Sequence, residues 1–78
     1  MALKDLVVTM AQALVDDPDA VEVQEIEGDH NCLLELKVAK DDIGKVIGKE
    51  GRTAQSMRAI LAAASAKAGR RANLDILD

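Results

Sequence analysis

The sequence predicts an α+β fold, a two-layer sandwich in which a three-stranded mixed sheet packs on three helices. Two apolar segments have the three- and four-residue spacing of helices, and the clearest period-two segment of the chain, residues 32–38, lies between them. Gly48 and Gly51 separate a short helical pattern from the longer one that follows. The elements therefore read helix, strand, strand, helix, helix, strand. We treat residues 1–78 as one domain, because a chain of this length has room for a single core.

The first predicted element is a helix. Its apolar residues recur at three- and four-residue intervals as one stripe, formed by Leu3, Leu6, Val7, Met10 and Leu14. Pro18 ends this segment, because proline cannot continue a helix and disfavours the helical conformation just before it. The aspartates around it, in residues 16–19, indicate a solvated loop, since a hard cation needs more oxygen ligands than this run offers.

Two strands should follow as an antiparallel hairpin. Val21 and Val23 alternate with polar residues, and Ile26 then falls out of phase, which predicts a bulge near the end of the first strand. Residues 28–31 form the turn. The second strand has the clearest period of two in the chain, with one apolar face formed by Cys32, Leu34, Leu36 and Val38.

A second pair of helices and a last strand are expected after residue 40. Asp41 or Asp42 can cap the short helix, which carries Ile43, Val46 and Ile47 and ends at Gly48. The longer helix begins at Arg52 and has an apolar stripe made of Met57, Ile60, Leu61, Ala64 and Ala68. Gly69 closes it, and the basic residues near that end, Lys67, Arg70 and Arg71, suit the negative end of a helix.

The last strand contains Ala72, Leu74 and Ile76 in alternation with polar residues. A helical crossover joins it to the middle strand, which favours a parallel pairing if the two strands are neighbours. The core must be aliphatic, because the chain contains no Phe, Tyr or Trp. Such a core is thin in a chain this short, and self-association would help it.

Charge is strongly segregated along the chain, although the net charge is only −4. Residues 1–36 contain one basic and nine acidic residues, whereas residues 37–71 contain nine basic and three acidic ones, a balance of −8 against +6. This pattern indicates one anion-facing surface on an acidic body, so the net charge does not exclude RNA.

Other features favour a cytoplasmic binding protein without a cofactor. The sequence has no apolar run that could span a membrane, no start typical of a signal peptide and a single cysteine, Cys32, expected to be a small buried hydrophobe. His30 is the only histidine and lies alone in a turn, so neither a zinc site nor a Ser–His–Asp or Cys–His catalytic set is expected. We therefore expect no enzyme, no metal and no small-molecule substrate.

The stretch from Ile43 to Arg52 carries the main functional signal. Gly48 to Gly51 should form a tight turn, and a glycine lets the backbone of another molecule come close. The first amides of the following helix lack intrahelical partners, and with Lys49 and Arg52 nearby they form a phosphate-binding arrangement. On its own, G-x-x-G more often marks a helix cap at Gly48 followed by a turn glycine at Gly51, and its context favours the binding role. Its spacing fits neither a Walker A loop nor a dinucleotide fingerprint.

In this context the motif resembles a known family. Residues 46–52, Val-Ile-Gly-Lys-Glu-Gly-Arg, resemble the signature of a KH domain, and the element order resembles the type II arrangement of that domain. The length and residues 41–58 are similar to the small bacterial KhpA family of single-KH RNA-binding proteins. The resemblance covers nearly the whole chain. It implies that the loop clamps the backbone of about four single-stranded nucleotides, whose bases lie over an apolar groove.

The resemblance also implies which residues contact RNA. The loop and its flanking helices supply them, namely Ile43, Lys45, Val46, Ile47, Gly48, Lys49, Glu50, Gly51, Arg52 and Gln55. Glu50 puts a negative charge into the loop, and Ala54 replaces a larger aliphatic residue of many KH domains. Both departures lower the expected affinity.

Finally, the resemblance implies pairing, with a second copy or with a KhpB-type KH protein, and a role in post-transcriptional regulation or RNA chaperoning. Small residues on the long helix offer a surface for close helix approach, namely Ala59, Ala62, Ala63 and Ala66. An alternative hypothesis is a protein-interaction module with weak or lost RNA binding, for which Glu50 and the acidic first half argue. Salt dependence separates the two hypotheses, because phosphate contacts weaken steeply with added salt.

Overall fold

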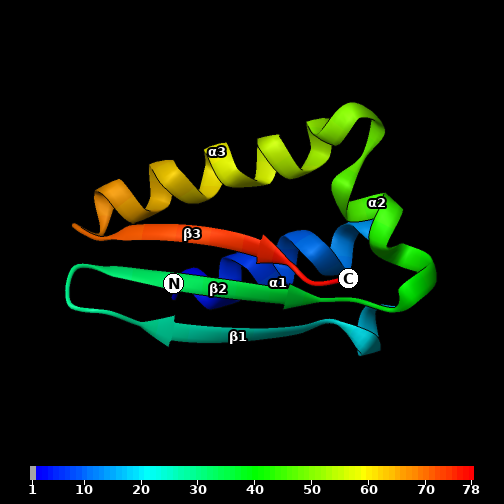
Figure 1. Cartoon of the computed structure of the whole chain (residues 1–78), viewed down its shortest axis with the longest axis horizontal. Helices are drawn as coiled ribbons and strands as arrows, with labels where there is room; N and C mark the ends of the chain where they lie inside the picture. The colour runs from blue at the N-terminus through cyan, green and yellow to red at the C-terminus, as the bar shows by residue number, and fades with distance from the viewer. Residues whose placement is uncertain (1) are drawn as a thin grey trace.

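The computed structural model describes residues 2–78, which form one three-stranded sheet in the spatial order β1-β2-β3 (Figure 1). β1 (Glu22–Glu27) and β2 (Asn31–Lys37) are an antiparallel hairpin. β2 and β3 (Arg71–Ile76) are parallel, with Leu34 opposite Leu74. The mixed sheet and the parallel pairing of the second and third strands are thus confirmed.

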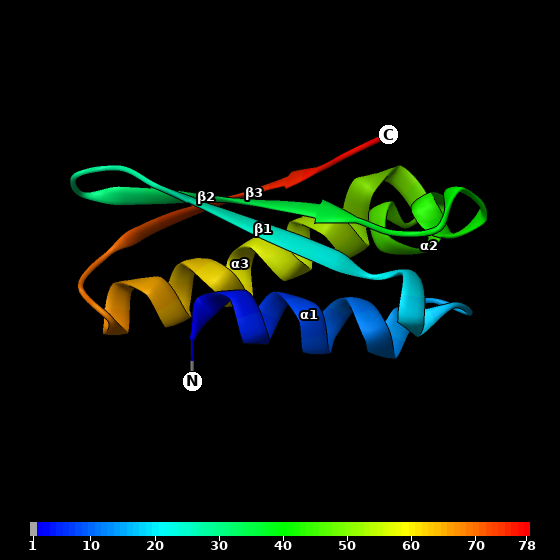
Figure 2. The same cartoon turned by 90° about the horizontal axis from the view of Figure 1, so that it is seen from below.

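Three α-helices complete the sandwich. α1 (Leu3–Leu14) and α3 (Arg52–Lys67) lie on one face of the sheet, whereas the other face is uncovered (Figure 2). α2 (Ile43–Ile47) is short and lies beyond the end of β2 (Figure 1). Single 3-10 turns occur at Pro18–Ala20, Lys40–Asp42 and Lys49–Gly51. Within residues 2–78 no helix is both long and apolar enough to cross a membrane.

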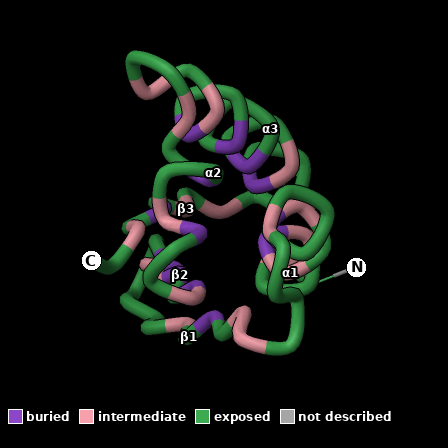
Figure 3. Tube along the Cα trace, turned by 90° about the vertical axis from the view of Figure 1, so that its right-hand side faces the viewer, coloured by how far each residue is buried: buried purple, intermediate pink, exposed green. Residues whose placement is uncertain are grey.

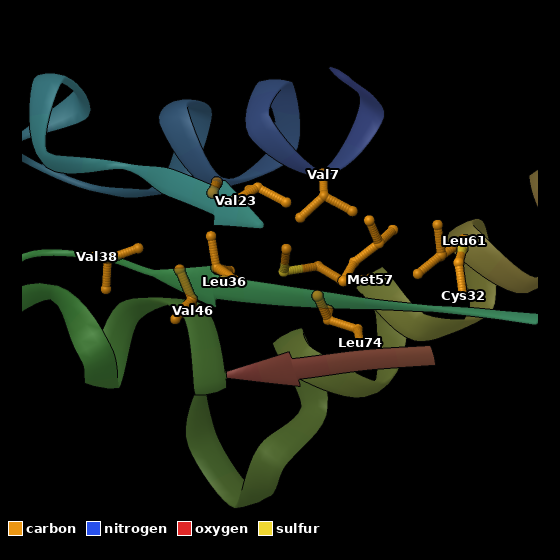
Figure 4. Close-up of a cluster of buried hydrophobic side chains, with 11 residues drawn as sticks. Val7, Val23, Cys32, Leu36, Val38, Val46, Met57, Leu61 and Leu74 are labelled. Carbon is orange, nitrogen blue, oxygen red and sulfur yellow. The ribbon is translucent and has the colours of Figure 1, made fainter. Parts of the chain in front are cut away.

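The core lies between the sheet and the two long helices, where the buried residues face inward (Figure 3). The alternation of β2 determines its position, because all four apolar residues predicted on one face of that strand are buried. Val7 of α1 and Met57 and Leu61 of α3 pack onto this face (Figure 4). The full cluster is aliphatic and consists of Val7, Ala11, Val23, Cys32, Leu34, Leu36, Val38, Val46, Met57, Leu61 and Leu74.

β1 has no bulge, so the prediction of a bulge near the end of the first strand is wrong. Pairing continues without interruption to the end of β1, with Ile26 opposite Leu33 and Glu27 opposite Cys32. Ile26 therefore belongs to the uncovered face of the sheet and is 46% exposed. Successive side chains of a strand point to opposite faces of the sheet. Ile26 is out of phase with the buried Val23 because it lies on the opposite face, and no bulge is needed to explain this.

The apolar stripes of the two long helices are narrower than their spacing predicts. Leu14 is 39% exposed and Ile60 is 51% exposed, and Ala68 is exposed as well. Ala11 and Ser65 occupy the buried line in their place. The physical reason is that α1 and α3 share one sheet face, so the residues that flank the contact between the two helices remain at the surface.

Candidate nucleic-acid interface

The loop between α2 and α3 is a tight turn fixed by its own backbone. The N–H of Gly48 donates to the carbonyl of Gly44 at 2.9 Å and ends α2, and the N–H of Gly51 donates to the carbonyl of Gly48 at 3.1 Å. Gly48 has φ 77° and ψ 173°, and Gly51 has φ 74° and ψ 12°. Both conformations lie at positive φ, where glycine is the favoured residue.

The two glycines are required for different reasons. A Cβ atom on Gly48 would overlap the side chain of Thr53 and lie 2.8 Å from its backbone nitrogen, so no side chain fits there. A Cβ atom on Gly51 would meet nothing within 4 Å. Gly51 therefore leaves an open approach to the backbone, and only its positive φ favours glycine.

The charged residues of the loop are at the surface. Lys49 is exposed and forms no ion pair within residues 2–78. Arg52 is also exposed, and its Nη2 lies 3.2 Å from Oε2 of Glu50. Glu50 itself has φ 59° and ψ 24°, a left-handed conformation that is uncommon for a residue other than glycine. The loop thus presents one free cation and one cation that is paired inside the loop.

α3 starts directly after this loop and has no side-chain cap at its N-terminus. The N–H of Arg52 donates to the carbonyl of Lys49, but the next amides of the first turn lack helical partners. The positive end of a 16-residue helix therefore points at the loop. Gln55 is exposed in the first turn of α3, near the same end. Free amides, a positive helix end and adjacent cations together form an anion-binding arrangement.

α2 supplies an apolar surface beside the loop, with one correction. Ile43 is half-buried and Ile47 is 36% exposed, so both can meet a ligand. Val46 is completely buried in the core and cannot contact RNA directly (Figure 4). Its prediction as a contact residue is therefore corrected, because the helix turns this position toward the sheet and Val46 supports the surface from beneath.

The base of α2 is fixed by a buried carboxylate. The capping hydrogen bond expected from Asp42 is absent, because its Oδ2 instead accepts from the N–H of Asp17 at 3.1 Å. Its Oδ1 lies 3.3 Å from Nζ of Lys45. Burial raises the pKa of Asp42, but hydrogen bonds from the backbone of Asp17 and Asp16 and from Lys45 outweigh it. The pKa of Asp42 consequently lies below its usual value.

Lys45, one of the predicted RNA contacts, is occupied by two carboxylates. Its Nζ lies 3.3 Å from Asp16 and 3.3 Å from Asp42. The hydrogen bond to Asp16, and then the one to Asp42, raise the pKa of Lys45. Two carboxylates thus compete with any phosphate for this ammonium, which distinguishes Lys45 from the loop residue Lys49, unpaired within residues 2–78.

The sequence reasoning missed three residues beside α2. A cavity of about 650 Å³ lies between the end of β2, the start of α2 and the chain after β3, and it is lined by Lys37, Val38, Lys40, Ile43, Leu77 and Asp78. Lys37, Lys40 and Leu77 were not among the predicted contacts. Both lysines belong to the basic segment of residues 37–71 and lie shortly before Ile43 in the sequence. This charge and position were the signal from which they could have been predicted.

A helix-strand-strand-helix-helix-strand domain with a G-x-x-G loop between its second and third helices is a KH domain of type II architecture. The model of the family described as "KhpA/KhpB, KH domain" matches residues 4–76. The chain belongs to this family. The family is one of binding domains and not of enzymes, which confirms the expectation that the chain is not an enzyme.

Relatives and a solved structure agree with this assignment. The chain is 53% identical over 73 residues to the RNA-binding protein KhpA of Caldanaerobacter subterraneus subsp. tengcongensis, covering 94% of this chain and 97% of that one. It is 51% identical over 76 residues to the RNA-binding protein KhpA of Halalkalibacterium halodurans, covering 97% and 100%. The fold is similar to part of Era in complex with MgGDPNP and nucleotides of 16S ribosomal RNA, with TM-score 0.66 and 20% identity over 95% of this chain and 28% of Era.

Proposed function

We propose that this protein binds single-stranded RNA by gripping its backbone with the Gly48–Gly51 loop, and that it acts in post-transcriptional regulation as an RNA chaperone. The observation that carries the proposal is the loop itself. It combines two glycines at positive φ, the exposed cations Lys49 and Arg52 and the uncapped N-terminus of α3. The relatives' name, RNA-binding protein KhpA, supports the same function.

On this proposal the phosphates meet the loop and the bases lie along α2. Ile43 and Ile47 offer apolar contacts, and Gly44 between them has nothing within 4 Å of the position a Cβ would take. Lys37 and Lys40 flank the adjoining cavity and can meet further phosphates. The chain has no aromatic residue on which a base could stack, so contacts with the backbone should carry most of the affinity.

A single domain of this kind recognises only a few nucleotides, so pairing of two copies would raise the affinity through effective concentration. The alanines of α3 proposed for this contact, Ala59, Ala62, Ala63 and Ala66, are all exposed. Ile60 lies beside them and, with Leu14, lines an apolar groove between α1 and α3. We extend the proposed pairing surface to Ile60, for a second copy or for a KhpB-type KH protein.

The loop is tested with the double variant Lys49→Asp, Glu50→Asp. Fluorescence anisotropy with short single-stranded RNA should show salt-sensitive binding for the wild type and none for the variant, because two carboxylates then face the phosphate. Lys4→Asp is the matched control, since it changes the net charge equally in the first turns of α1, at the opposite end of the molecule (Figure 2). Equal binding by the folded double variant would exclude the loop as the clamp.

Pairing is tested by sedimentation across the micromolar range. The wild type should sediment at twice the chain mass of 8.3 kDa, and Ile60→Glu should sediment as a monomer. Thr9→Glu, an exposed change on α1, is the control. A wild type that remains at the monomer mass would exclude self-pairing. If the wild type pairs but binds no RNA at low salt, the protein-interaction hypothesis takes the place of RNA binding.

A further inference from the structure

β1 forms a free edge of the sheet. The strand order β1-β2-β3 leaves the outer side of β1 without a neighbouring strand within residues 2–78. Figure 2 looks onto this edge, and no element lies in front of β1, whereas α1 runs beside the strand on the helix-covered face. β1 is six residues long, a typical length for a paired strand. Such an edge is a template on which another extended chain can pair.

The register of the hairpin shows which backbone groups face outward. The N–H of Gly28 donates to the carbonyl of Asn31 at 2.8 Å, and the pairing with β2 then continues without interruption. In an antiparallel ladder, hydrogen-bonded pairs alternate with pairs whose backbone groups point away from each other. Every second residue of β1 therefore turns its N–H and carbonyl to the outer edge, namely Val23, Glu25 and Glu27. No hydrogen bond found within residues 2–78 uses these outward groups.

This edge lies in the most acidic part of the chain. Residues 16–29 contain seven acidic residues and neither lysine nor arginine. Arg70 lies 3.8 Å from Glu25 and 3.2 Å from Glu27, so one cation serves two carboxylates. Glu22, the third acidic residue of β1, is exposed and has no ion pair within residues 2–78. The edge therefore keeps a net negative charge.

Apolar side chains flank the edge on both faces of the sheet. On the uncovered face, Ile26 is 46% exposed and lies opposite Leu33 of β2. On the other face, Val8 of α1 is half-buried against the core. Helical periodicity places Val8 roughly opposite Leu6 and Met10, which line grooves shared with α3, so Val8 is on the side of α1 away from α3. A strand added beside β1 would extend the sheet over Val8 and over Ile26.

We propose that the outer edge of β1 binds an extended segment of a partner protein, in which lysine or arginine alternates with apolar residues, by strand addition. Backbone hydrogen bonds give such a complex its affinity, and alternate side chains give it specificity. A second copy does not fit, because two β1 edges would bring like charges opposite each other. The same charge repels RNA. Figures 1 and 3 place β1 on the far side of the molecule from α2, so the segment can bind whether or not the Gly48–Gly51 loop holds RNA.

The first test uses the wild type and an octapeptide of alternating lysine and valine. Saturating peptide should slow the amide hydrogen exchange of Val23, Glu25 and Glu27, measured by NMR, about fivefold, because each N–H gains a hydrogen bond. The amides of Gln24 and Ile26 already face β2 and should not change. Protection of all amides of β1 alike, or of none, would overturn strand addition. The same alternating protection in concentrated protein without peptide would make a second copy the occupant and overturn the cationic partner.

The second test separates the strand pattern from net charge by fluorescence anisotropy with labelled peptides. Glu22→Lys should weaken binding of the alternating octapeptide about fivefold, the effect of one opposite-charge pair across strands. Asp75→Lys is the matched control, because it makes the same charge change at an exposed position of the other edge strand, β3. An octapeptide of four lysines followed by four valines has the same composition without the alternation and should bind at least about fivefold more weakly.

Three outcomes of this second test would overturn the proposal. Equal binding of the two octapeptides would assign the affinity to charge alone. Equal losses in folded Glu22→Lys and Asp75→Lys would show that the peptide does not select the edge of β1. An absence of binding to the wild type would exclude the edge as a docking surface for a cationic segment, while the RNA-binding function of the loop would be unaffected.

Discussion

The two ends of α3 carry the same kind of side chain and use it differently. At the N-terminal end, Lys49 and Arg52 are exposed, and the one carboxylate near them, that of Glu50, belongs to the same loop. At the other end, Arg70 lies 3.2 Å from Glu27 and 3.8 Å from Glu25. A cation near the C-terminus of a helix is favourable, and two carboxylates of β1 hold it in place there.

This difference shows how an acidic protein can present a basic surface. The carboxylates of the first half of the chain pair with cations outside the loop, as Glu25 and Glu27 pair with Arg70 and Asp16 pairs with Lys45. None of them lies within ion-pair distance of Lys49 or Arg52 in the part of the chain that the structure describes. Within residues 2–78, the acidic first half of the chain therefore does not neutralise the cations of the loop at the N-terminal end of α3.

The largest expected effect concerns the backbone of that end. Gly48→Ala should destabilise the fold by about 3 kcal/mol or more, because φ 77° with ψ 173° is essentially restricted to glycine and the new Cβ would overlap Thr53. Gly51→Ala should cost about 1 kcal/mol, since it meets no neighbour and needs only a left-handed conformation. Thermal melts of both variants measure the difference. Equal losses would show that the overlap with Thr53 relaxes at no cost.

The next effect concerns the base of α2 and its dependence on pH. The pKa of Asp42 is lower in the folded protein than in the unfolded chain, so the stability it contributes is present above the unfolded pKa. That stability is lost as the pH falls through the lowered pKa. We expect Asp42→Asn to reduce the melting temperature by several degrees at pH 7 and by much less at pH 3. Melts across this range measure it, with the exposed neighbour Asp41→Asn as the control; parallel curves for wild type and variant would contradict the assignment.

A smaller effect compares the two ends of α3 directly. Arg52→Gln should weaken RNA binding several-fold and reduce the slope of log affinity against log salt by about 0.7, the value for one phosphate contact on a single strand. Arg70→Gln removes the same charge but should leave both quantities unchanged, because Arg70 is already paired with Glu25 and Glu27. Anisotropy titrations at several salt concentrations measure both. An equal loss in the two variants would mean that RNA responds to net charge and not to the loop.

How much of this could be predicted from the sequence depends on the range of the interaction. Local patterns gave the element order, the four buried residues of β2 and the turn between Gly48 and Gly51, because each depends on neighbours a few positions apart. The exposure of Ile60 depends on how α1 and α3 share the sheet. The pairs Arg58–Leu74, Lys45–Asp16 and Arg70–Glu27 join residues 16 or more positions apart, and no local pattern encodes them.

The smallest expected effect concerns Glu50, whose carboxylate reduces the difference in available positive charge between the two ends of α3. This carboxylate lies 3.2 Å from Nη2 of Arg52 and therefore competes with a phosphate for part of that guanidinium. Glu50→Gln should therefore raise RNA affinity, but only about two- to fivefold, because an exposed ion pair contributes little. The salt slope should steepen at the same time, because the freed Arg52 can neutralise a phosphate more fully.

Glu50→Gly separates this electrostatic effect from backbone strain. It also frees Arg52, and it relieves the left-handed conformation of residue 50 as well, so it should stabilise the fold where Glu50→Gln does not. Equal gains in affinity for the two variants would assign the effect to charge. A gain confined to Glu50→Gly would assign it to the flexibility of the loop. No gain in either would show that the ion pair between Glu50 and Arg52 does not compete with phosphate.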